Sequence, residues 1–72
     1  MPKEFLELAA DVFGVDAATL TPETAYESIP EWDSVAHLRL VMETEARFGR
    51  TIPLEAVASL RTLADFGPYV ES

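Results

Sequence analysis

Two stretches of this 72-residue chain carry apolar residues at helical spacing, and each is followed at once by a glycine. In the stretch from Lys3 to Phe13 the apolar positions are Phe5, Leu8, Ala9, Val12 and Phe13. A recurrence every three or four residues places side chains on one face of a helix, and glycine readily adopts the left-handed conformation that ends one. We therefore predict a helix over 3–13 that ends at Gly14.

The second stretch predicts the longest helix, over 34–48, with Asp33 or Ser34 as its N-terminal cap and Gly49 after its last turn. At about 100° per residue, two apolar stripes emerge on different sides. One stripe, predicted to be buried, contains Leu40, Val41, Thr44 and Phe48; the other contains Val35, Leu38 and Met42. Because a small bundle buries one broad face of a helix, the second stripe is either additional core, which helical spacing alone favours, or a partner surface.

The remaining segments are loops and short helices. Residues 15–33 contain two prolines and no sustained period, which predicts a loop of about 19 residues with Leu20, Tyr26 and Ile29 as its anchors in the core. Pro53 suits the first position of a short third helix that continues to about residue 60. Thr62 and Asp65 predict a capping box for a last helix, and the Gly-Pro pair at 67–68 predicts that it is short or kinked.

These elements predict an all-α fold: a small bundle of three to four helices, with a long loop between helices 1 and 2. Residues 1–72 are enough for one domain, which we expect to fold alone as a monomer. The absence of cysteine excludes a disulfide framework and a Cys-type zinc site, so any thiol chemistry must be imported. No apolar signal region or lipid-spanning run is present, which predicts a cytoplasmic protein without a membrane partner.

The net charge of −8 is concentrated in the first half of the chain, which has no basic residue between Lys3 and Arg39. A field of this sign repels nucleic acid and anionic lipid and attracts basic protein surfaces. The alternative is that the acidity serves only solubility.

Ser34 lies where the long loop meets the long helix, and its hydroxyl has two interpretations. Spacing alone favours a plain helix cap, from either Ser34 or Asp33. The other interpretation is that the helix dipole and the unpaired N–H groups favour a phosphate on this serine. A nucleophilic serine is not supported, because the one histidine, His37, follows on the same helix and is interpreted as a packing or surface residue. We therefore expect no enzymatic activity.

The sequence Asp33-Ser34-Val35 resembles the Asp-Ser-Leu motif of acyl carrier proteins. The similarity continues in register over nearly the whole chain, through Leu38, Leu40, Val41, Met42, Glu45, Phe48, Gly49, Ile52, Pro53, Thr62, Leu63 and Asp65. This resemblance implies a helical bundle whose Ser34, preceded by Asp33, receives 4′-phosphopantetheine from coenzyme A through a magnesium-dependent phosphopantetheinyl transferase. The thiol of that arm then carries an acyl group as a thioester.

The resemblance also implies partners: an acyl-loading ligase or transferase and downstream synthase enzymes. It favours Val35, Leu38 and Met42 as the apolar part of their docking surface, with Asp33 and Glu45 attracting a basic enzyme face. Arg39 interrupts the acidic side of the helix and is expected to discriminate among partners.

The chain departs from bacterial fatty-acid carriers at several positions. Ala36, Arg39 and Ala46 occupy outward positions that are commonly acidic, which leaves Asp33, Glu43 and Glu45. His37 and Thr44 would give a polar lining to an acyl-sequestering cavity, which disfavours a long alkyl chain. These departures indicate a discrete carrier of specialised metabolism, such as polyketide, lipopeptide or antibiotic biosynthesis. The alternatives are an aminoacyl or peptidyl carrier of nonribosomal assembly, a domain excised from a larger synthase, and an unmodified helical interaction module in which Ser34 is only a cap.

Overall fold

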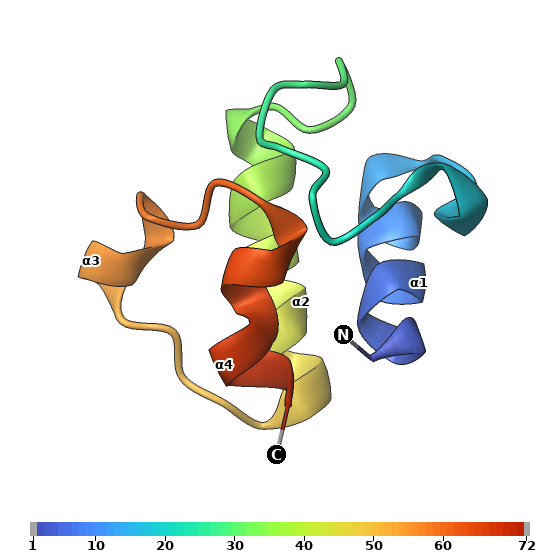
Figure 1. Cartoon of the computed structure of the whole chain (residues 1–72). Helices are drawn as coiled ribbons and strands as arrows, with labels where there is room; N and C mark the ends of the chain where they lie inside the picture. Colours follow the sequence, from blue (N-terminus) through green and yellow to red (C-terminus); the bar gives the residue numbers. More distant parts are fainter. Residues whose placement is uncertain (1, 72) are drawn as a thin grey trace.

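The computed structural model describes residues 2–71, and within this range the chain is helical, as predicted. The first two helical elements are α1 (Lys3–Phe13) and the short 3₁₀ helix η1 (Ala17–Thr19). They are followed by α2 (Ser34–Phe48), α3 (Leu54–Val57), η2 (Leu63–Phe66) and α4 (Gly67–Val70). Figure 1 shows α1 and α2 running antiparallel, with α4 against α2 and α3 on the outer side. The only strand-like pairing among the described residues is an isolated antiparallel bridge between Ala25 and Thr62.

The two long helices have the predicted bounds because their ends are chemically specified. Gly14 and Gly49 follow them with φ angles of 72° and 65°, in the left-handed region that glycine enters without a steric penalty. The N–H of Gly14 donates to the carbonyl of Ala10, and that of Gly49 to the carbonyl of Glu45. These bonds satisfy carbonyl groups in the last turn of each helix.

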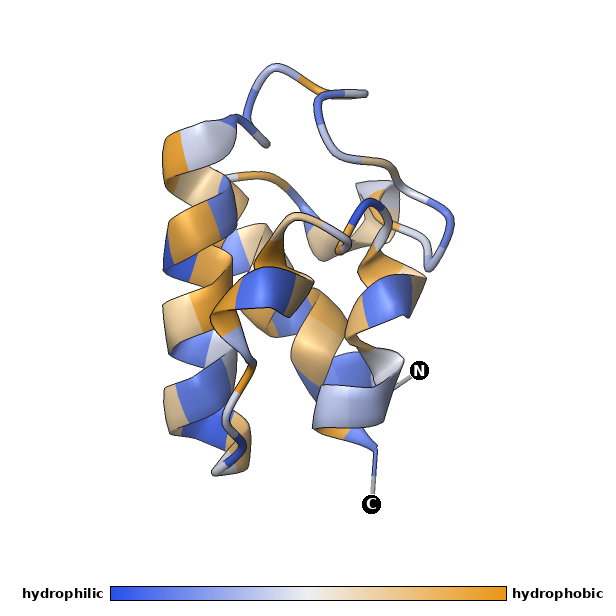
Figure 2. Cartoon of the chain, turned by 90° about the vertical axis from the view of Figure 1, so that its left-hand side faces the viewer, coloured by the Kyte–Doolittle hydropathy of each residue, from blue (hydrophilic) through white to orange (hydrophobic). Residues whose placement is uncertain are grey.

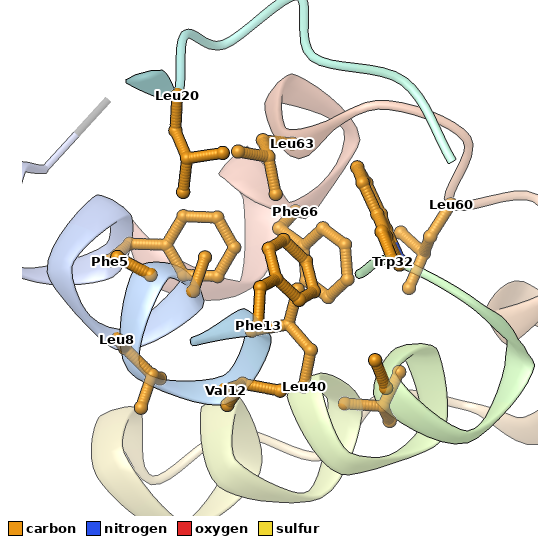
Figure 3. Close-up of a cluster of buried hydrophobic side chains, with 14 of the residues drawn as sticks. Phe5, Leu8, Val12, Phe13, Leu20, Trp32, Leu40, Leu60, Leu63 and Phe66 are labelled. Atoms are coloured by element: carbon orange, nitrogen blue, oxygen red, sulfur yellow. The ribbon is translucent and has the colours of Figure 1, made fainter. Parts of the chain in front are cut away.

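The core is one cluster of buried side chains between α1, α2 and the C-terminal segment (Figure 3). Its centre is aromatic: the ring centroids of Phe5 and Phe66 lie 5.1 Å apart. Phe48, predicted to be buried, is only partly buried, because it lies in the last turn of α2 and contacts the edge of Phe5 at 6.4 Å.

The long loop is held to the rest of the molecule at several points. Leu20 is buried and Tyr26 and Ile29 are partly buried, as predicted for anchors. Trp32 was not predicted as an anchor, yet it is fully buried. Backbone hydrogen bonds also join the loop to the segment before α4; the N–H of Tyr26 donates to the carbonyl of Arg61 at 2.7 Å.

The third predicted helix is shorter than expected. Pro53 is its N-cap rather than its first residue, and α3 ends at Val57 instead of near Leu60. The N–H groups of Ser59 and Leu60 donate to carbonyls three residues back, which tightens the chain into a turn and brings Leu60 into the core.

The capping box at Thr62 and Asp65 is present, and it opens η2, which continues directly into the single turn of α4. The last helix is therefore short, as predicted. Backbone N–H groups of Arg61 and Thr62 donate to Oδ2 of Asp65, and these bonds hold the pKa of that carboxyl below its usual range.

Candidate functional site

The N-terminus of α2 is capped by Asp33, which leaves the Ser34 hydroxyl unnecessary for that role. Oδ1 of Asp33 accepts the N–H of Ala36 at 2.9 Å, and its carbonyl accepts the N–H of His37 at 2.9 Å. Ser34 is the first residue of the helix and is exposed. Of the two cap residues that the sequence allowed, the structure selects Asp33.

Two residues before Ser34, the chain is fixed by Trp32. The indole Nε1–H donates to Nδ1 of His37 at 3.0 Å, inside the core. Because an indole nitrogen only donates, Nδ1 must be the acceptor and the proton of the neutral imidazole is on Nε2. That nitrogen lies 2.9 Å from the carbonyl oxygen of Val57 and donates to it. His37 therefore joins the loop, α2 and α3, which confirms a packing role.

Aromatic contacts complete this support beneath the serine. The Trp32 ring stacks on Phe13 from α1 at 5.2 Å and on His37 at 5.9 Å. Tyr26 packs its ring edge-on against Trp32 at 6.0 Å. Ser34 is consequently exposed on a stretch of backbone held by buried residues two positions before it, at Trp32, and two and three positions after it, at Ala36 and His37.

The outward face of α2 carries the second apolar stripe. Val35, Leu38 and Met42 are 67%, 54% and 67% exposed. The inference from helical spacing alone, that they add to the core, is therefore wrong. Leu54, at the start of α3, is 84% exposed and was not singled out from the sequence, where its place after Pro53 suggested only a helix start. Figure 2 shows that hydrophobic residues of α2 are concentrated in its N-terminal half, the half that begins at Ser34.

The charged and small positions on α2 differ from the predicted outward set in two respects. Ala36 is buried and so is not outward, whereas Arg39 and Ala46 are exposed. Glu45 is partly buried, and its Oε2 accepts the backbone N–H of Ile52 at 2.8 Å. Its carboxylate thus ties α2 to the segment that leads into α3, while Glu43 is exposed.

The start of α2 is arranged for the attachment of a phosphate. Residues 2–71 contain no group of three or more His, Cys, Asp or Glu side chains placed to hold a metal ion, and no helix in that range is long and apolar enough to cross a membrane. By contrast, helix geometry leaves the N–H groups of Ser34 and Val35 without carbonyl partners inside α2. With the positive end of the helix dipole, they suit a phosphate attached to the serine oxygen.

Comparison with known proteins agrees with this geometry. Residues 3–70 match the family model described as "Phosphopantetheine attachment site". The acyl carrier protein of Rubrobacter xylanophilus is 38% identical over 64 residues, which is 89% of this chain and 79% of that protein. The acyl carrier protein of Micrococcus luteus is 29% identical over 65 residues, or 90% of this chain and 80% of that protein. The meromycolate extension acyl carrier protein of Mycobacterium tuberculosis is 31% identical over 65 residues; the match spans 90% of this chain and only 56% of that protein.

Proposed function

The chain belongs to the phosphopantetheine-attachment family of carrier proteins, and from that premise we propose that Ser34 is the residue that bears the 4′-phosphopantetheine arm. Proteins of this family are carriers and not enzymes, and their prosthetic group is covalently attached. The bound arm supplies a terminal thiol, which holds an acyl group as a thioester. The thiol that this cysteine-free chain lacks is thereby provided.

The observation that carries the proposal is the position of Ser34 at the start of α2. Two other serines are described. The Ser28 hydroxyl donates to the carbonyl of Ala25 at 2.6 Å, and Ser59 follows α3 instead of preceding a helix. Only Ser34, among the serines within 2–71, combines an exposed hydroxyl with the N-terminus of a long helix.

The Ser34 hydroxyl, the N–H groups of the first turn and Asp33 have different roles in attachment. Its hydroxyl oxygen forms the new P–O bond and loses its proton, while the adenosine bisphosphate part of coenzyme A leaves. The N–H groups of the first turn face the phosphate that results. Asp33 fixes the first turn through its bond to Ala36 and adds a negative charge for the transferase to recognise.

The exposed stripe Val35, Leu38 and Met42 is proposed as the apolar docking surface for the transferase, the acyl-loading enzyme and the synthase enzymes that follow. Unpartnered side chains of this kind release water when a partner covers them, so they contribute mainly to the lifetime of a complex. Of the two acidic residues expected to attract a basic enzyme face, Asp33 is exposed, whereas the Glu45 carboxylate already accepts the Ile52 N–H. Arg39, expected to discriminate among partners, is exposed on the same helix. We therefore place more of the charge recognition on Asp33 and Arg39.

A carrier of specialised metabolism is the finer proposal. It is supported by Arg39 on the exposed face and by His37 inside the bundle, two of the departures from an acidic-faced, apolar-lined fatty-acid carrier. The similarity to proteins named acyl carrier protein favours an acyl carrier over a peptidyl carrier or an unmodified helical module.

The attachment proposal is tested by intact mass after incubation with coenzyme A, magnesium and a broad-specificity phosphopantetheinyl transferase. We expect one phosphopantetheine per chain. Ser34→Ala should abolish the addition without changing helical content, because Asp33 and not Ser34 caps α2. Ser28→Ala, at another exposed serine, is the matched control and should be modified normally. Addition to Ser34→Ala, or none to the unaltered chain while a control carrier is modified, would refute the proposal.

The partner proposal is tested by Arg39→Glu. With a fatty-acid malonyl transferase, whose docking surface is basic, the substitution should speed association, and the gain should shrink as ionic strength rises beyond about 0.15 M. The measurement is the rate of malonyl transfer to Arg39→Glu and to the unaltered chain at a series of salt concentrations. If neither these rates nor those with the cognate loading enzyme change, Arg39 is an ordinary solvated residue and the argument for specialised partners fails.

A further inference from the structure

We propose that the Trp32–His37 pair closes the interior of the bundle to the carried acyl group, so that this chain presents its cargo outside the helices. The inference rests on the proposed attachment at Ser34 and makes the pair a determinant of cargo class. The acyl groups that suit such a carrier are short or polar ones, which need no shelter from water.

The first support is the continuity of the ring stack beneath Ser34. The planes of Phe13 and Trp32 are inclined by 27°, and those of Trp32 and His37 by 24°, so three nearly parallel rings cross from α1 through the loop to α2. Tyr26 closes on His37 from the loop at 5.1 Å, and Phe66 from η2 at 6.2 Å. An alkyl chain that enters from the serine end of α2 meets this stack first.

The second support is that the stack cannot open without losing hydrogen bonds. The Trp32 indole and both His37 nitrogens are paired, to each other and to the carbonyl of Val57. Separating the two rings would leave a donor and an acceptor without partners in an apolar interior, a cost that apolar contacts from a guest chain do not restore.

The third support is the packing behind the pair. Leu40 and Thr44 are fully buried, and the Thr44 hydroxyl donates to the carbonyl of Leu40 at 2.6 Å. Within residues 2–71 the structure has no pocket. A guest chain would therefore have to displace side chains that are already close-packed.

The test uses the chain's single tryptophan as a reporter. The ¹⁵N-labelled protein is loaded at Ser34 from acetyl-coenzyme A or octanoyl-coenzyme A by the transferase, and intact mass verifies each product. We expect the one indole N–H signal at the same position in both acylated forms, with the same midpoint of thermal unfolding. A displaced indole signal and a higher midpoint in the octanoyl form alone would overturn the inference, because a sheltered chain stabilises the folded state. Failure of loading would instead count against attachment at Ser34.

A variant sharpens the test. His37→Ala removes one ring of the Trp32–His37 pair. The octanoyl form of this variant should now show a displaced indole signal and a higher unfolding midpoint than its acetyl form. Glu43→Ala, an exposed position on the same helix, is the matched control and should behave as the unaltered chain does. If folded His37→Ala shows no dependence on chain length, the pair is not the barrier. If His37→Ala does not fold, the spectra of the unaltered chain decide the question alone.

Discussion

Both faces of α2 carry apolar side chains, but one face is buried and the other is exposed to solvent. On the inward face Leu40 and Val41 are buried against the other helices, and the polar groups of His37 and Thr44 are all paired. On the outward face Val35, Leu38 and Met42 contact solvent over more than half of their surface. Hydrophobicity alone thus did not decide which face of this helix became core.

The difference lies in what each face meets. Phe5 and Phe13 from α1 and Phe66 from η2 pack in the core on the inward side, and Trp32 from the loop supplies its ring and its N–H. No described element covers the outward stripe. An exposed apolar stripe of this kind is typical of an interaction surface, which is why we propose it as the docking surface.

The largest effect should come from a matched pair of truncations, one on each face. Leu40→Ala removes a fully buried side chain and should lower the free energy of unfolding by about 2–5 kcal/mol. Met42→Ala, two residues along the same helix, should change it by about 0.5 kcal/mol or less, because that side chain is mostly exposed. Urea unfolding followed by circular dichroism measures both. Equal losses of unfolding free energy would contradict the division of α2 into a buried face and an exposed face.

A smaller effect is expected at His37, where the inward face of α2 carries a hydrogen-bonded polar side chain. His37→Ala leaves the Trp32 indole N–H unpaired in the core and should cost about 1–3 kcal/mol, in addition to the lost ring contacts. His37→Gln keeps one acceptor and one donor on the side chain and should recover part of that loss. The midpoints of thermal unfolding of His37→Ala, His37→Gln and the unaltered chain measure these losses. If glutamine recovers nothing, the ring and not its hydrogen bonds carries the contribution of His37.

The smallest effect concerns the end of the inward face, where Phe48 is only partly buried. Its edge-on contact with Phe5 contributes about 0.5–1.5 kcal/mol beyond area burial. Phe48→Ala should therefore cost less than the about 3–5 kcal/mol typical of a fully buried phenylalanine, and Phe5→Ala, at a fully buried ring, serves as the comparison. Denaturant midpoints, compared at an unchanged slope of unfolding free energy against denaturant concentration, measure the stability lost in each variant. Equal losses in Phe48→Ala and Phe5→Ala would mean that the core extends through the last turn of α2.

Local chemistry made several features predictable. Glycine at 14 and 49 specifies where the two long helices end, and the Asp-Ser step at 33–34 specifies where α2 begins, because caps and left-handed residues act within a single turn. The position of Ser34 followed from the same local rule. The short C-terminal helix followed from the Thr62–Asp65 capping box and from Pro68.

The tertiary structure decided what depends on residues distant in the chain. Periodicity shows which side chains share a face of α2 but not which face other elements will cover. It therefore identified Val35, Leu38 and Met42 only as a stripe, and the resemblance to acyl carrier proteins was what favoured an exposed surface. The roles of Trp32, His37 and Glu45 depend on partners five, 20 and seven residues away, whose positions no local pattern specifies. The sequence by itself determined the ends of the two long helices that glycine terminates and the position of Ser34 at the start of α2, because those depend on interactions within one turn. Only the packed structure decided which side of α2 is open to partners and that the space beneath Ser34 is filled, because burial is a property of all the elements together.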